Sequence, residues 1–135
     1  MRAQIVATAL AALLPLTAAA DEVWTSDMGK IIYDSEVGDA AIFTFTNVDA
    51  YPATLVIPGL AGNYSDRGVH EAYWVGEGAG DCAGFRTAPN GAGSAQWGRA
   101  LVAFDKPAFP TSFTLLIGFC LDPYVTSIRA ETTAN

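Results

Sequence analysis

The sequence of 135 residues is poor in the side chains on which most catalytic centres depend. It has one histidine, two cysteines and two lysines, Lys30 and Lys106. It lacks the H-E-x-x-H of zinc proteases, the G-x-S-x-G of hydrolases and the acidic spacing of an EF-hand. The glycine-rich stretches 76–80 and 91–93 lack a P-loop lysine and a dinucleotide-binding pattern. These absences favour a non-catalytic protein with no metal and no cofactor.

Long apolar runs are confined to the first residues of the chain. Arg2, the run Ile5–Leu16 and the small residues that end at Ala20 match a secretory signal peptide. The run is shorter than the roughly 20 apolar residues that a membrane-spanning helix needs. We therefore expect cleavage after residues 1–20 and a single mature β domain over 21–135. No span is expected in the mature chain, which we place in a periplasm or outside the cell.

Positive charge is also scarce, and it is scattered. Loss of Arg2 would leave six basic residues against fourteen acidic ones, a formal charge of −8. No basic cluster is available to follow a phosphate backbone or an anionic membrane surface, so neither nucleic acid nor a membrane is an expected partner. The acidic balance favours solubility or a basic protein partner.

The two cysteines, Cys82 and Cys120, are predicted to form a disulfide, because an exported chain meets oxidising conditions and one pair allows one connectivity. The bridge would close a loop of about 39 residues. Such a loop contributes roughly 4 kcal/mol to stability in the chain-entropy model.

Alternating apolar residues predict short strands. In residues 39–47 Ala41, Phe43 and Phe45 share one face, as a half-buried strand requires. Further strands are expected at 30–36, 53–57, 69–75, 99–105, 112–120 (buried on both faces) and 124–130. Thirteen glycines and seven prolines punctuate the chain. We predict an all-β fold, an antiparallel β-sandwich or small barrel of about seven to nine short strands, with 76–98 as a flexible segment.

The stretch 69–75 carries most of the candidate site residues. If it is a strand, His70 and Trp74 lie on one face and Glu71 and Tyr73 on the other, so His70 and Glu71 cannot pair with each other. A structural ion pair is expected between Glu71 and an arginine, Arg86 or Arg99. Amphipathic aromatic rings suit half-exposed binding surfaces. The predicted ligand-binding residues are His70, Glu71, Tyr73, Trp74 and Trp97.

Three functions are compatible with these patterns. The first is an exported, non-catalytic, monomeric domain that binds a protein partner or a glycan of the cell envelope. The second is a small secreted hydrolase that uses Glu71 with His70 or Asp81. The third is a structural protein that assembles through an exposed sheet edge.

Overall fold

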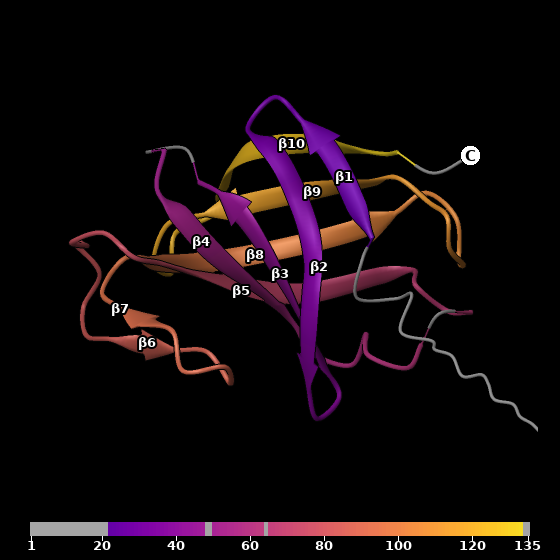
Figure 1. Ribbon diagram of the computed structural model, residues 1–135. Coiled ribbons are helices and arrows are strands. Elements are labelled where there is room, and N and C mark those ends of the chain that lie inside the picture. Colours follow the sequence, from indigo (N-terminus) through magenta and orange to yellow (C-terminus); the bar gives the residue numbers. More distant parts are fainter. Residues whose placement is uncertain (1–21, 48–49, 64, 134–135) are drawn as a thin grey trace, which may run out of the picture.

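A computed structural model describes residues 22–47, 50–63 and 65–133, which fold into strands and connecting loops without a helix (Figure 1). The strands are β1 (Val23–Ser26), β2 (Gly29–Val37), β3 (Ala40–Thr46), β4 (Pro52–Ile57), β5 (Val69–Gly76), β6 (Arg86–Thr87), β7 (Gly93–Ser94), β8 (Trp97–Phe104), β9 (Phe113–Gly118) and β10 (Tyr124–Thr132). The predicted signal peptide, residues 1–20, lies outside the described residues. No helix in the described part is long and apolar enough to cross a membrane.

Eight strands form a closed antiparallel barrel in the order β1-β10-β9-β8-β5-β4-β3-β2, and β6 and β7 form a separate small sheet. The all-β prediction is confirmed, and of its two architectures the barrel is the one observed. The chain runs from each barrel strand to a neighbouring one, in places through a tight turn, as at Gly38, where a positive φ of 61° suits glycine between β2 and β3. A larger excursion, residues 77–96, separates β5 from β8.

Side chains fill the barrel interior. Ala41, Phe43 and Phe45 share the inner face of β3 as predicted and are buried in the interior cluster, but Ile42 on the outer face is buried as well, so the expectation of a single buried face is wrong. The Trp24 ring stacks on Phe43 at 5.2 Å between centroids and meets the edge of Phe113 at 4.9 Å. An eight-stranded barrel is just wide enough to be filled in this way. Any binding surface is therefore to be sought on the outside.

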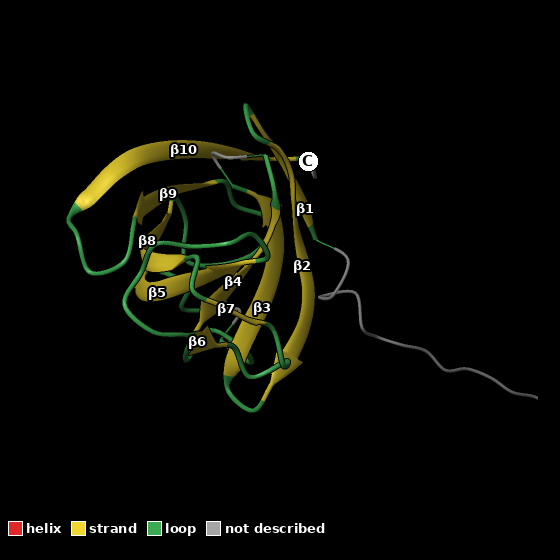
Figure 2. Ribbon diagram, turned by 90° about the vertical axis from the view of Figure 1, so that its left-hand side faces the viewer, coloured by secondary structure: helices red, strands yellow, loops and turns green. Residues whose placement is uncertain are grey.

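The small sheet β6–β7 lies outside the barrel, beside β4 and β5 (Figure 2). Ala88 of this excursion packs with Ile42, Val56, Val75 and Trp97 on the outer wall, and all five are buried. Strands β3, β4 and β5 are thus buried on both faces where it covers them. The expectation that 76–98 is a flexible segment is wrong, because it contains the β6–β7 sheet and packs against the barrel.

The other strands keep one exposed or half-buried face. Burial on both faces was predicted for 112–120, but Thr114 and Leu116 on the outer side of β9 are only half-buried. No strand was predicted over residues 23–26, where β1 lies. This strand matters, because it carries Trp24 into the core and joins β2 to β10.

A buried ion pair lies at the start of β1. Two Arg67 nitrogens donate to the two Glu22 carboxylate oxygens, at 3.0 and 2.7 Å, and the side chains are 1% and 4% exposed. The main-chain N–H of Arg67 donates to the Pro107 carbonyl oxygen at 2.7 Å. The pair therefore links β1, the loop before β5 and the loop between β8 and β9.

Candidate functional site

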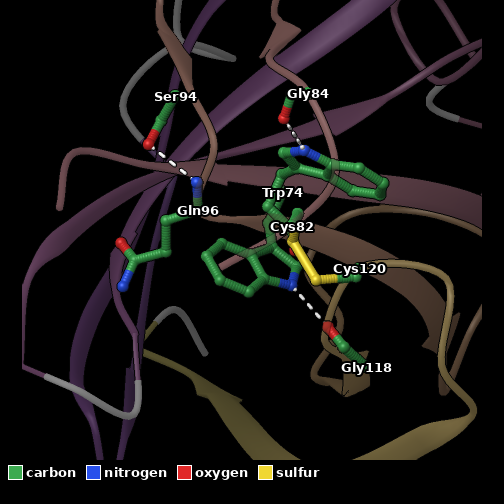
Figure 3. The surroundings of a disulfide bond; sticks show 8 residues. Trp74, Cys82, Gly84, Ser94, Gln96, Gly118 and Cys120 are labelled. Atoms are coloured by element: carbon green, nitrogen blue, oxygen red, sulfur yellow. Dashed lines mark hydrogen bonds between the residues drawn. A yellow bond between two sulfur atoms is a disulfide. The ribbon is translucent and has the colours of Figure 1, made fainter. Parts of the chain in front are cut away.

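The Cys82–Cys120 disulfide joins the excursion 77–96 to the turn that follows β9 (Figure 3). Its Cα atoms are 5.3 Å apart, so the predicted bridge is present. Main-chain hydrogen bonds reinforce the junction: the Cys120 N–H donates to the Trp97 carbonyl at 2.8 Å, and the Cys82 N–H donates to the Ala95 carbonyl at 3.1 Å. The bridge is consistent with an exported protein. We call this junction, with the residues around it, the disulfide corner.

Both candidate tryptophans are buried, whereas half-exposed rings were expected. Trp74 is 0% exposed inside the barrel, and its indole N–H donates to the Gly118 carbonyl at 2.9 Å (Figure 3). Trp97 is 7% exposed on the outer wall, and its indole N–H donates to the Gly84 carbonyl at 3.1 Å. These carbonyl oxygens allow both rings to be buried, because a buried indole N–H needs a hydrogen-bond acceptor.

A pocket of about 210 Å³ opens at the disulfide corner. It is lined by Ala79, Gly80, Asp81, Cys82, Gln96, Trp97, Phe119 and Cys120. The glycine-rich loop at its rim is held by Gln96, whose Oε1 accepts from the Gly78 N–H at 3.2 Å. A Cβ on Gly76 would lie 2.1 Å from that oxygen, so the close approach depends on glycine. The sequence singled out this loop and Trp97, and the structure brings them together.

The predicted strand 69–75 exists as β5, and it places His70 and Glu71 on opposite faces. No hydrogen bond or ion pair of the described residues joins Glu71 to His70 or Asp81. The expected ion pair between Glu71 and Arg86 or Arg99 is also absent from the described contacts. The two arginines lie over aromatic rings instead.

Arg86 and Arg99 each stack on a tyrosine of the outer wall. The Arg86 guanidinium carbon lies 4.0 Å from the centroid of Tyr73 and 5.6 Å from that of Trp97. The guanidinium carbon of Arg99 lies 5.1 Å from the centroid of Tyr124. Tyr73 and Arg99 are also direct cross-strand partners between β5 and β8. The two stacks are therefore neighbours on one surface.

Exposed apolar side chains flank the disulfide corner. Phe85 and Leu121 are 75% and 73% exposed, and Val125 at the start of β10 is similarly open. Phe85 is three residues from Cys82 and Leu121 adjoins Cys120, so the bridge joins the two segments that carry them. Sequence reasoning missed these residues. Their closeness to the two cysteines was the available signal, but the exposure of each depends on the folded wall.

The five predicted ligand-binding residues are thus divided by the fold. Tyr73 and Trp97 meet at Arg86 beside the disulfide corner, and Glu71 is exposed on the same outer face. Trp74 is enclosed in the barrel, and His70 lies half-buried on the same side of β5 as Trp74. The outer surface near the disulfide corner carries exposed apolar side chains and guanidinium groups, and both can contact a ligand. No protein-family model matches the chain, and no curated protein or solved structure matches it.

Proposed function

We propose that this protein is an exported, non-catalytic domain that binds a protein partner through the disulfide corner. The observation that carries the proposal is the pair of exposed side chains, Phe85 and Leu121, on the two segments that the bridge fixes together. Apolar anchors on a rigid support lose little conformational entropy when they bind, and such anchors dominate the energetics of protein interfaces. Because side chains fill the barrel interior, we look for the binding site on this outer surface.

A protein partner fits the surface better than a glycan. Sugar rings are commonly bound by exposed flat aromatic rings that carry a polar group, and Trp74 and Trp97 are buried here. Phe85 and Leu121 are wholly apolar, and a partner side chain of similar character would cover them. The pocket beside them, with Trp97 and Phe119 in its lining, has room for one such side chain.

Site-specific photo-crosslinking tests the proposal in cells that make this protein. A benzophenone amino acid at position 85 or 121 should trap one defined partner protein from the envelope. Phe85→Ala and Leu121→Ala should each weaken binding of the purified partner by about tenfold or more, the range of an interface anchor.

Phe109→Ala is the matched control. Phe109 is also a half-exposed phenylalanine, but it lies in the loop between β8 and β9, in another part of the barrel from β6–β7 (Figure 1). Its replacement should leave partner affinity unchanged. Equal weakening by all three variants, or retention of a glycan instead of a protein, would count against the proposal.

One observation supports the assembly function as a second candidate. β10 pairs with β1 only at Glu131 and Thr132, although it pairs with β9 from Tyr124 to Ala130. The first half of β10 therefore has no described strand on its other side, which is the feature that strand addition uses. A shift toward a dimer in size-exclusion chromatography at high concentration, abolished by Ser127→Pro, would favour this function. A monomer at every concentration would oppose it.

A further inference from the structure

We infer that the partner segment recognised at the disulfide corner is acidic, and that Arg86 and Arg99 are the residues that bind its carboxylates. The inference rests on the proposed function and adds the chemistry of the partner. It differs from the expectation of a basic partner, which rested on the net negative charge of the whole chain.

The first observation is that these two arginines have no carboxylate partner among the described residues. The ion pairs there are Arg67 with Glu22, and Arg129 with Asp105 and Glu131. Arg86 and Arg99 make no ion pair of this kind, although acidic residues outnumber basic ones two to one. In an acidic chain, two arginines on one wall that lie over rings are positioned for an external anion.

The second observation is the way each guanidinium is held. The guanidinium carbons of Arg86 and Arg99 lie over the rings of Tyr73 and Tyr124, at 4.0 and 5.1 Å from the ring centroids. A stacked guanidinium keeps its N–H groups at the edge of the plane, where a carboxylate can accept two of them. Holding a guanidinium over a ring before binding reduces the entropy that binding would otherwise cost.

The third observation is the mixed character of the surroundings. Exposed Phe85 directly precedes Arg86 in the chain, and exposed Leu121 directly follows Cys120, so apolar and cationic residues belong to the two segments that the disulfide joins. Exposed carboxylates interrupt the two arginines: Asp81 beside Cys82, Asp122 beside Leu121 and, on the face of β5 that carries Tyr73, Glu71. A uniform polyanion, such as a sulfated glycan or nucleic acid, would meet those carboxylates. A polypeptide with acidic and apolar residues in a fixed order can avoid them.

Fluorescence anisotropy with synthetic peptides tests this chemistry. The probe is a labelled short peptide in which glutamate and leucine alternate, and its control replaces every glutamate with lysine. The wild-type domain should bind the glutamate peptide at least about tenfold more tightly. Arg86→Gln and Arg99→Gln should each weaken that binding by roughly tenfold, the range of a charge-assisted hydrogen bond.

Two further variants separate geometry from charge. Arg86→Lys keeps the charge but loses the planar fork, so it should bind the peptide more weakly than wild type and more tightly than Arg86→Gln. Arg129→Gln removes an arginine that is already ion-paired, so peptide affinity should stay within about twofold of wild type. Equal affinity for the two peptides, an equal effect of Arg129→Gln, or tighter binding of heparin than of the glutamate peptide overturns the inference.

The crosslinking assay distinguishes the two proposals. If the Phe85-position crosslink to the partner persists in an Arg86→Gln, Arg99→Gln double variant with undiminished partner affinity, the acidic-partner inference fails and the proposed function stands. If wild-type protein carrying the photoreactive group traps no protein, the proposed function itself fails.

Discussion

Removal of the buried carboxylate of Glu22 is expected to destabilise the barrel strongly. Glu22 and Arg67 share two hydrogen bonds and are almost wholly shielded from solvent. Glu22→Ala takes away the negative charge and leaves the positive one buried. Breaking a buried ion pair from one side typically costs about 3–5 kcal/mol. That loss is a large part of the roughly 5–15 kcal/mol by which a domain of this kind is stable.

Urea denaturation followed by tryptophan fluorescence measures this loss. Trp24 and Trp74 are buried in the barrel, so their emission should report global unfolding. The midpoint should fall while the slope with urea stays constant, because the surface exposed on unfolding is unchanged. At about 4 °C per kcal/mol for a domain of this size, the melting temperature should fall by about 12–20 °C.

An exposed ion pair provides the matched control. Asp105 accepts two hydrogen bonds from Arg129, but both side chains are 43% exposed. Asp105→Ala should therefore cost no more than about 1 kcal/mol. The double replacement Glu22→Leu with Arg67→Met should cost less than Glu22→Ala, because no charge is left in the interior. Equal losses from Glu22→Ala and Asp105→Ala would refute the reasoning.

The same carboxyl group gives a pH dependence with a definite sign. Burial raises the pKa of Glu22 above its ordinary 4.5, and the hydrogen bond and charge of Arg67 oppose the rise. A carboxyl whose folded pKa is raised stays protonated up to a higher pH in the folded state than in the unfolded chain. The stability that this bound proton contributes is therefore complete below pH 4.5 and is lost as the pH rises through the folded pKa. Glu22→Gln should remove this slope from a plot of stability against pH.

Three further predictions concern other parts of the fold. Cys82→Ser, which frees Cys120 from a crosslink spanning 38 positions, should lower the unfolding free energy by about 4 kcal/mol in non-reducing urea denaturation, and an unchanged midpoint would contradict this. Gly98→Ala would place a Cβ 1.9 Å from a main-chain oxygen of β9, so soluble yield and melting temperature should drop; a wild-type melting curve would disprove the clash. The Arg129 hydrogen bond lowers the pKa of Asp105 below 3.8, so stability falls as the pH drops through the folded pKa, and Asp105→Asn should flatten that acid limb in thermal melts.

Much of the barrel wall could be predicted from local patterns. Phe43 and Phe45 alternate with Thr44 and Thr46 on β3, and Ala100 and Val102 share one face of β8, because a strand sends successive side chains to opposite faces. The Gly38 turn and the end of β4 before Pro58 were likewise readable, since both depend on the conformational preferences of single residues.

The candidate site was less predictable. Tryptophans such as Trp74 and Trp97 are common in binding surfaces, but here both are buried. Trp74 lies in the barrel interior, and Trp97 lies under the outer layer. The outer layer comes from the excursion 77–96, whose small residues carry no strong period of two. Either Arg86 or Arg99 was expected to pair with Glu71, and the fold places them over Tyr73 and Tyr124 instead. These outcomes depend on which distant segments meet.

The sequence alone therefore determined the strand class, the positions of the main turns and the identity of the disulfide, because each follows from neighbouring residues or from a count of two cysteines. Only the tertiary structure decided that the sheet closes, through pairs such as Trp24 with Thr132, and that the outer wall is covered in one place and open at Phe85 and Leu121. Closure and coverage arise from contacts between residues far apart in the chain, and a period of two records the direction of a side chain but not what lies opposite it.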